Sequence, residues 1–372
     1  MCYTENTFSL KIKQMIYLNA LNKIPGIGPQ KMKILMSHFG DSKKIWESEL
    51  SEIIAGGINE KLAQIIVRER VRINPELEWE KLTRENIRLI DFDSPDYPRL
   101  LKEIPSAPYL IYYKGDYDFN SRPLLAIVGS RKFTTYGQQV ALSLARDLAG
   151  AGITVVSGMA LGIDTFAHRG ALEAGGQTLA VLGSSLEDSF IGPRTNFNLS
   201  RQIIANGALL SDYPPGTQAT AQTFPARNRL MAGLTTGTIV VEAAQQSGTL
   251  ITANMALDFN REVFSVPGNI FSPVSQGTNS LIKQGAKIIT GVNDILEELN
   301  LTDFRQEKKI QEIIPASKEE EIILQILSNE PQHIDRIIKL SKINTSIVSS
   351  TLIILEMKGY IKDMGGQNYI RY

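Results

Sequence analysis

The sequence predicts an α/β protein built around a doubly wound, mostly parallel sheet. Short apolar runs alternate with segments of helical periodicity between residues 124 and 300, and several runs are apolar throughout, as strands buried on both faces require. The region before them shows helical spacing alone, and residues 318–372 read as three helices and a strand–turn–strand. At about 100–200 residues per domain, a chain of 372 residues suffices for two or three domains.

Residues 1–90 are predicted to form a helical domain. Residues 21–32 read LNKIPGIGPQKM, an apolar–Gly–apolar–Gly pattern between two helices that is typical of a helix-hairpin-helix. Glycines let backbone N–H groups approach a phosphate closely, and the following helix turns its positive end to the same oxygen. We therefore expect a secondary DNA contact at Gly26, Gly28 and Lys31. A helical hairpin used only for packing is the alternative.

The central domain is expected to span residues 91–300 and to open with a Pro-rich connector, residues 91–123. Each proline biases the preceding residue toward an extended conformation and stops a helix. Tyr109–Lys114 is predicted to be an edge strand that leads into the sheet. The strands predicted after it are 124–128, 153–157, 178–182, 208–211, 238–242, 262–266 and 287–290, and the helices 137–149, 164–174, 197–205 and 249–259.

Residues 301–317 are predicted to be a linker, and residues 318–372 a third domain. Three helices followed by a terminal hairpin are typical of a winged helix, a variant of the helix-turn-helix. The helices are predicted at Glu319–Leu327, Ile334–Leu340 and Thr345–Met357, and the strands at Tyr360–Asp363 and Tyr369–Tyr372.

The first candidate site follows the first core strand, where Gly129, Ser130, Arg131 and Lys132 lead toward a helix. A Gly-Ser turn there lies at the carboxyl end of the strand, where open α/β sheets bind ligands. Arg131 is suited to hold a phosphate through two parallel hydrogen bonds. A surface arginine on an ordinary strand–helix loop is the alternative.

The second candidate is the loop that carries Ser157, Gly158 and Gly162 and ends at Asp164. Its glycines are expected to leave backbone donors open to an anion, and Asp164 is expected to be the N-cap of the next helix. The spacing is neither GxGxxG nor GxxxxGK[ST], so neither a dinucleotide site nor a Walker-type ATP site follows. His168, one turn into that helix, is expected to be structural.

The third candidate is an aromatic residue followed by two arginines: Phe224, Arg227, Asn228 and Arg229. An aromatic ring beside guanidiniums can stack on a base and clamp the phosphates of a single strand. Replacing Arg131 and Arg227 together is expected to weaken such binding with little loss of folding. A helix start with an exposed basic turn is the alternative.

The fourth candidate, Ser247 and Gly248, precedes a helix whose N-terminus can face an anion, and a structural role fits it equally well. No set of nucleophile, base and acid accompanies the four loops, so no catalytic residue is predicted and the protein is not expected to be an enzyme. Three histidines far apart and one cysteine predict no metal site, and no cofactor is expected.

Composition limits the partners and the compartment. Lys and Arg together number 39, as do Asp and Glu, which excludes a basic coat over the whole molecule but not one basic pocket. A single cysteine excludes a disulfide within the chain and favours a reducing compartment. The sequence has no run of about 18 apolar residues and no secretory signal, so we expect no membrane contact and a cytoplasmic protein.

Seven segments resemble, in the same order, the DNA-processing protein A family (DprA, also called Smf). They are VGSRKFTTYG, SGMALGIDTFAHRGALEAGG, SDYPPGT, FPARNRLMAGL, VVEAAQQSGTLIT, EVFSVPGNIFSPVSQGTN and LIKQGAKIIT. The similarity is close over residues 90–300 and weaker at both ends. It implies an extended Rossmann-like domain that forms a homodimer, with a helix-hairpin-helix (SAM-like) domain before it and a winged helix after it.

The resemblance also implies a function and its residues. Members of the family are non-enzymatic binders of incoming single-stranded DNA in natural transformation, which protect the strand and load RecA recombinase onto it. The family's pocket arginine falls on Arg131, and Leu161 stands where members usually carry Arg, so one positive charge is missing from the rim. The F-P-x-R-N motif and the glycine loop fall on Phe224, Arg227 and Arg229, and on Ser157, Gly158, Gly162 and Asp164.

Two other functions remain open. One is a phosphoribohydrolase that cleaves nucleoside monophosphates on a related Rossmann-like fold, for which a P-G-G-x-G-T-x-x-E motif is typical. The comparable stretch here, QQSGTLIT, lacks the paired glycines and the following glutamate. The other is a structural or nucleotide-sensing adaptor.

Overall fold

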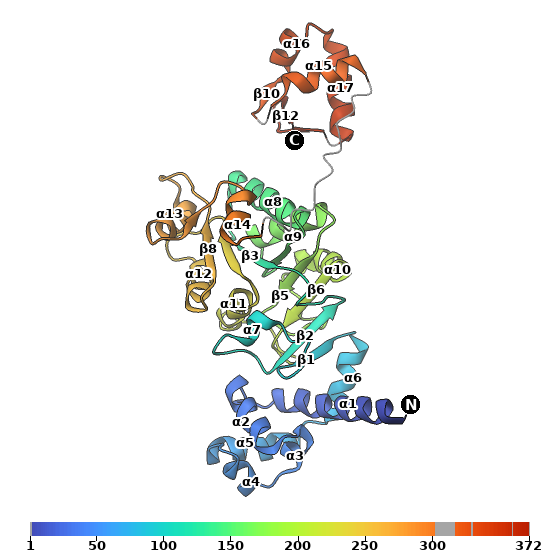
Figure 1. Ribbon diagram of the computed structural model, residues 1–372, viewed down its shortest axis with the longest axis vertical. Helices are drawn as coiled ribbons and strands as arrows, with labels where there is room; N and C mark the ends of the chain where they lie inside the picture. The colour runs from blue at the N-terminus through green and yellow to red at the C-terminus, as the bar shows by residue number, and fades with distance from the viewer. Residues whose placement is uncertain (1, 302–316, 329, 359, 372) are drawn as a thin grey trace. The chain divides into compact units, whose positions relative to one another are not determined.

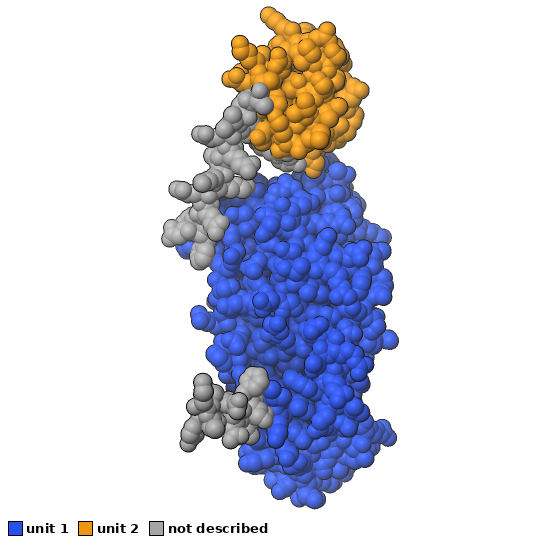
Figure 2. Space-filling model, turned by 90° about the vertical axis from the view of Figure 1, so that its right-hand side faces the viewer, with its two compact units in different colours: residues 1–306 blue, residues 307–372 orange. Residues whose placement is uncertain are grey.

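The computed structural model describes residues 2–301, 317–328, 330–358 and 360–371. Residues 1–306 and 307–372 cluster into two separate units (Figure 2). The first unit includes both the N-terminal helices and the large sheet, so the boundary at residue 90 stays a prediction. Of the predicted linker, residues 302–316 lie outside the described residues.

The N-terminal helices pack around leucines and isoleucines at helical spacing, including Leu18, Leu21 and Leu35, all of which are buried. Three of the helices begin at an Asp or Asn side chain that accepts a backbone N–H, which satisfies donors left open at a helix start. The helices are α1 (Cys2–Asn22), α2 (Pro29–Phe39), α3 (Ser42–Glu47), α4 (Leu50–Ala55), α5 (Glu60–Arg70) and α6 (Pro75–Arg84).

The central sheet has nine strands in the order β1-β2-β6-β5-β4-β3-β7-β8-β9. All pairs from β6 to β9 in that order are parallel, which confirms the predicted doubly wound α/β class. The strands are β1 (Arg88–Asp91), β2 (Leu110–Gly115), β3 (Leu124–Val128), β4 (Thr154–Ser157), β5 (Thr178–Val181), β6 (Gly207–Ser211), β7 (Gly237–Val240), β8 (Glu262–Ser265) and β9 (Lys287–Ile288).

Successive side chains of a strand point to opposite faces of the sheet, so alternate residues pack into two different hydrophobic cores. Leu125 and Ile127 pack with α8 (Thr135–Gly150), α9 (Ile163–Glu173) and α14 (Val292–Glu298). Leu124 and Val128 pack with the helices of the other face, α7 (Arg99–Lys102), α11 (Thr223–Leu234), α12 (Gly248–Asp258) and α13 (Gln276–Lys283). Figure 1 shows these layers, with α10 (Phe197–Ala205) beside β6.

The predicted edge strand at 109–114 exists as β2, but its place at the edge is wrong. Strand β1 pairs outside it in antiparallel register, with Arg88 opposite Tyr113, and β2 itself pairs antiparallel with β6. The four residues of β1 are too few to show a periodicity, so only the pairing reveals this strand.

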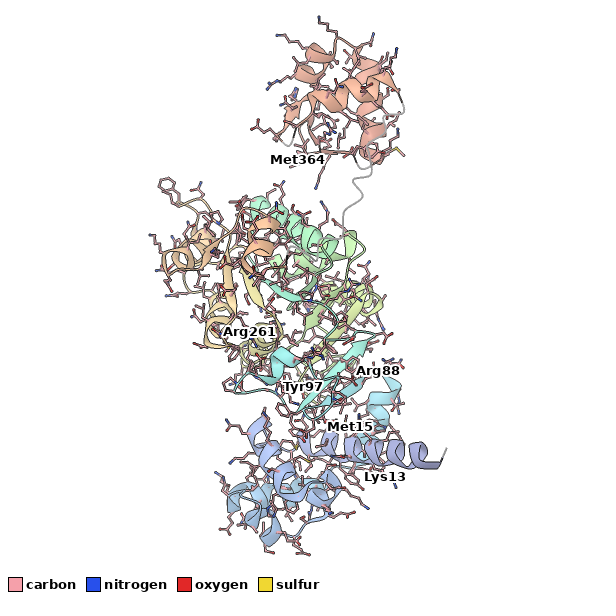
Figure 3. All side chains as sticks on the ribbon, in the orientation of Figure 1. Lys13, Met15, Arg88, Tyr97, Arg261 and Met364 are labelled. Carbon is pink, nitrogen blue, oxygen red and sulfur yellow. The ribbon has the colours of Figure 1, made fainter. Side chains whose placement is uncertain are left out.

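The Pro-rich connector also contains α7 and is tied into the domain by hydrogen bonds. The hydroxyl of Tyr97 donates to the Pro108 carbonyl at 2.6 Å, and Arg261 donates to the Leu100 carbonyl at 3.0 Å. Figure 3 labels Tyr97 and Arg261 on these two segments of the molecule. The connector is therefore an integral part of the sheet domain.

The second unit contains the three predicted helices and the predicted hairpin. A short additional strand joins the hairpin to give the sheet order β10-β12-β11, and buried Ile323, Ile337 and Leu352 form the core. The elements are α15 (Lys318–Ile326), β10 (Gln332–His333), α16 (Ile334–Ser341), α17 (Thr345–Met357), β11 (Ile361–Asp363) and β12 (Asn368–Arg371).

The described helices are too short or too polar, one by one, to span a bilayer. In the part of the chain that the structure describes, no single helix is both long and apolar enough to cross a membrane. Helices α16 and α17 reach that length only as a pair, and they are bent by 115°.

Candidate nucleic-acid interface

A cavity of about 470 Å³ lies at the carboxyl edge of the parallel sheet. The carboxyl ends of parallel strands meet at one edge, so loops that are distant in sequence converge there. Ten of the fourteen residues predicted for the main DNA contact line it: Gly129, Ser130, Arg131, Lys132, Asp164, Phe224, Arg227, Asn228, Ser247 and Gly248. The other four, Ser157, Gly158, Gly162 and Arg229, lie outside its lining.

The turn after β3 presents two cations to the cavity. The Ser130 N–H donates to the Glu242 carbonyl at 2.7 Å, and its hydroxyl accepts the Lys132 N–H at 3.0 Å, which holds the turn in one shape. Arg131 and Lys132 are both exposed. The Arg131 guanidinium lies 5.2 Å from the centre of the Phe224 ring, a cation–π distance that aligns the arginine with the aromatic residue.

The N-terminus of α8 lies at the same edge but is closed to an anion. The buried Glu242 carboxylate accepts the Thr134 N–H at 3.0 Å and the Thr134 hydroxyl at 2.5 Å, and Thr134 is the N-cap of α8. A Cβ on Gly137 would lie 2.2 Å from this carboxylate. Glu242 therefore occupies the positive helix end that an incoming phosphate would otherwise use.

The loop after β4 differs from its predicted form. The N-cap of α9 is Gly162, at φ 87°, and Asp164 lies inside the first turn, so the N-cap prediction is wrong. The buried Asp164 carboxylate accepts the N–H groups of Gly158 at 3.1 Å and Ala160 at 3.4 Å. A buried carboxylate requires such donors. These two amides are therefore not open to an anion, contrary to the expectation from the sequence.

Arg227 is a buried guanidinium with only 4% of its surface exposed. Its Nη1 donates to the Gly158 carbonyl at 2.8 Å and also to the Val181 carbonyl, which ties α11 to the ends of β4 and β5. Burial raises the pKa of Asp164, and the Arg227 charge opposes that rise. Since a guanidinium stays protonated in proteins, the buried Arg227 places a positive charge near the buried Asp164, and both residues line the cavity.

Arg229 points away from the cavity. Side chains two residues apart on an α-helix differ by about 200° of rotation around the helix axis. Arg227 and Arg229 therefore emerge on opposite sides of α11. Arg229 donates to the Ser106 carbonyl at 2.6 Å and pairs with the Asp212 carboxylate. The structure therefore brings Arg131, Arg227 and Phe224 together but leaves Arg229 out of the group.

The N-terminus of α12 lines the cavity and has no acidic residue in its first turn. The Ser247 hydroxyl accepts the Thr249 N–H at 3.2 Å as N-cap, and a Cβ on Gly248 would meet nothing within 4 Å. Positive helix ends attract phosphates, and this end faces the open cavity.

Three of the predicted site residues act beneath the cavity surface. The Ser157 hydroxyl donates to the Ile127 carbonyl at 2.7 Å, which ties β4 to β3. A Cβ on Gly158 would lie 2.4 Å from the Arg227 guanidinium, and one on Gly162 would lie 2.4 Å from the Ser130 carbonyl oxygen. The two glycines therefore allow the close approach on which the Arg227 contact and the Arg131 turn depend.

We expect Gly162→Ala to lower the free energy of unfolding by about 2 kcal/mol, because its backbone is in a region that only glycine adopts without strain. The added methyl group would also displace the turn that carries Arg131. Gly248→Ala is the matched control, since that position has open space and an ordinary φ, and its stability should stay within about 0.5 kcal/mol of wild type. Urea unfolding of both variants measures the difference, and equal stabilities would contradict the argument.

The predicted secondary contact lies apart from the cavity, because none of Gly26, Gly28 and Lys31 lines it. Gly26 has φ 93°, and a Cβ on Gly28 would meet nothing within 4 Å, so the hairpin backbone is accessible there. The neighbouring Lys23 is engaged, at 2.7 Å from a Glu78 oxygen and 2.8 Å from the Pro215 carbonyl. DNA contact at this hairpin stays a prediction.

The cavity also has a lining that the sequence did not single out. These lining residues are apolar or small, and they carry no charge and belong to no recognised motif. Among them, only Thr249 could have been found from the sequence, because it lies at a predicted helix start. They are Val128, Ala160, Pro225, Met231, Ala244, Thr249, Ile251, Thr252, Pro273 and Val274. In the described ranges, no three His, Cys, Asp or Glu side chains are grouped as a metal site would require.

Comparison with known proteins assigns the family. Residues 88–300 match the model of DNA recombination-mediator protein A, and residues 307–367 match the DprA winged helix domain. This chain belongs to the DNA recombination-mediator protein A family. Protein Smf of Synechocystis is 33% identical over 96% of this chain and 99% of its own length.

Two solved structures of the family have the same fold. The X-ray structure of DNA processing protein A from Streptococcus pneumoniae has a TM-score of 0.66 and 33% identity, covering 76% of this chain and 97% of that one. The protein from Helicobacter pylori, whose structure concerns its single-stranded DNA binding mode, has a TM-score of 0.52 and 30% identity, covering 58% and 96%. The family resemblance and the winged helix are thus confirmed.

Proposed function

We propose that this protein binds single-stranded DNA in the cavity at the carboxyl edge of the sheet, without cleaving it. The observation that carries the proposal is the convergence of exposed Arg131 and Lys132, Phe224 and the N-terminus of α12 on one cavity of about 470 Å³. Membership in the family and the single-stranded DNA binding of the Helicobacter pylori relative support it.

Each part of the cavity has a separate task in this proposal. Arg131 and Lys132 donate hydrogen bonds to consecutive phosphates, and backbone amides at the start of α12 face the same strand. Phe224 supplies a ring for base stacking, which tolerates any sequence. The chain has no net charge, so the attraction is local and should weaken steeply with salt.

The alternative of a phosphoribohydrolase finds less support in the cavity. By the spacing of the G-T-x-x-E motif, Thr252 stands where the glutamate belongs, and Thr252 lines the cavity. The carboxylate that does line the cavity, Asp164, is buried and already accepts two backbone N–H groups. A carboxylate held in this way is poorly placed to act on a nucleotide.

The finer parts of the function rest on family membership. We propose that the protein protects incoming DNA in the cytoplasm during natural transformation, loads RecA recombinase onto it, and forms a homodimer through the Rossmann-like domain. A dimer would offer two cavities to one strand, and linked binding events strengthen each other through effective concentration.

Fluorescence anisotropy with matched single- and double-stranded oligonucleotides across a salt series tests the proposal. We expect preference for the single strand and a log–log salt slope of about −0.7 for each phosphate contacted. Base release from AMP is the parallel assay for the alternative. Equal affinity for both DNA forms, or AMP cleavage without DNA binding, would refute the proposal.

A further inference from the structure

A turn beside the cavity exposes two large apolar side chains that the DNA contact described above does not use. Ile270 and Phe271 are 75% and 85% exposed, in the loop between β8 and the cavity-lining Pro273. Phe271 is more exposed than Phe133 and Tyr136, which are 41% and 47% exposed. Adjacent side chains of this kind, left in water next to a binding site, indicate a surface that is covered when the ligand binds.

The turn is held in shape by its own hydrogen bonds. The Asn269 side chain accepts the Phe271 N–H at 2.9 Å, and the Asn269 carbonyl accepts the Ser272 N–H at 3.0 Å. An Asx turn of this type places the two apolar residues at its tip. The position of Phe271 is thereby set before any ligand arrives.

The base of the turn is also fixed. The side-chain amide of Asn279 accepts the Gly268 N–H at 3.2 Å and donates to the Gly268 carbonyl at 3.1 Å. A Cβ on Gly268 would lie 2.2 Å from the Ser275 hydroxyl oxygen, so the chain packs tightly where the turn leaves the sheet. A turn whose backbone is already ordered loses little conformational entropy when it binds a ligand.

The turn adjoins the cationic cavity directly. Pro273 and Val274 follow Phe271 by two and three residues, and both line the cavity with Arg131 and Lys132. Phe224, the cavity's own aromatic residue, is already in contact with Arg131. A strand whose phosphates lie on Arg131 and Lys132 therefore has a second ring, besides Phe224, available for a neighbouring base.

We infer that Phe271, supported by Ile270, is a base-stacking subsite for single-stranded DNA at the rim of the cavity. This inference rests on the proposed function of the cavity. It extends the contact from the phosphates and Phe224 to at least one further nucleotide. Stacking needs no sequence-specific hydrogen bond, so the subsite should accept any base.

The experiment compares Phe271→Ala with Phe271→Tyr in the full chain, using anisotropy with a single-stranded oligonucleotide. Phe271→Ala should weaken binding about five-fold or more, because a stacked base is lost, and Phe271→Tyr should restore affinity to within about two-fold. The salt slope should stay unchanged in both variants, because no phosphate contact is removed. An oligonucleotide carrying 2-aminopurine should lose part of its fluorescence quenching with Phe271→Ala.

Leu257→Ala is the matched control, since Leu257 is 57% exposed at the far end of α12 and does not line the cavity. It should bind like wild type. If wild type binds DNA and Phe271→Ala binds it with the same affinity, this inference alone is overturned. If wild type binds no DNA, the proposed function is refuted. If Phe271→Ala turns a dimer into a monomer by light scattering, the tip is an interface between copies, and the inference is also overturned.

Discussion

Arg131→Ala is expected to weaken binding of a single-stranded oligonucleotide about tenfold or more at low salt. Arg131 is exposed, lines the cavity and is aligned by the Phe224 ring, so its hydrogen-bond donors are free to meet a phosphate. A hydrogen bond to a charged group contributes about 1.5–3 kcal/mol, which corresponds to a factor of ten or more in affinity. Anisotropy titrations of the variant and wild type measure the effect.

The salt dependence separates a phosphate contact from an indirect effect. Losing one phosphate contact should reduce the magnitude of the log–log salt slope by about 0.7, while the free energy of unfolding stays unchanged. Arg122→Ala is the matched control, because Arg122 is an exposed arginine that precedes β3, at the opposite end of the strand from the cavity. Equal losses in the two variants would show that Arg131 acts only through the general charge of the domain.

Arg227→Ala should instead destabilise the protein, by about 3–5 kcal/mol. Its removal would leave the buried Asp164 without the positive charge that favours its carboxylate, and would deprive the Gly158 and Val181 carbonyls of a donor. The burial of Arg227 therefore revises the expectation that it can be replaced with little loss of folding. Urea unfolding followed by circular dichroism measures the change.

A second variant shows whether the charge pair is the cause. Asp164→Asn combined with Arg227→Met removes both charges and should recover a substantial part of the lost stability, since a neutral pair does not leave a lone ion. If Arg227→Ala loses DNA affinity while its stability stays within about 0.5 kcal/mol of wild type, Arg227 contacts the DNA directly.

The two arginines have different roles at the site: Arg131 is available to a ligand, and Arg227 stabilises the fold. Arg131 makes one aromatic contact and stays exposed, whereas Arg227 is buried and donates to two backbone carbonyls. Arg227 is only 4% exposed and donates to protein carbonyls, so it is not expected to contact a phosphate. Only the first arginine should therefore contribute to the salt slope.

The central strands and most of their helices follow from the sequence, because apolar runs and helical periodicity are local properties. Strand β3 begins and ends where it was predicted, and four predicted helices appear as α8, α9, α10 and α12. Parallel strands end at one edge, so the sequence also placed Gly129–Lys132 and Ser247 at a common site. Helix α11 was considered only as the alternative, a helix start at Phe224–Arg229, and its extent was not predicted, because Pro225 and the polar residues before it obscure where it begins.

The partners of the polar groups became visible only in the folded protein. Contacts between separate segments of the chain decide three features of the site and the sheet. They decide on which side of α11 Arg227 emerges, which amides donate to Asp164, and that β1 pairs with β2. Local patterns and motifs were enough to predict the sheet, the family and the loops that carry the site. The fold leaves Arg131 available to a ligand but uses Arg227 and Arg229 for its own contacts. The physical reason is that a buried charge is stable only beside polar partners, and packing alone brings those partners to it.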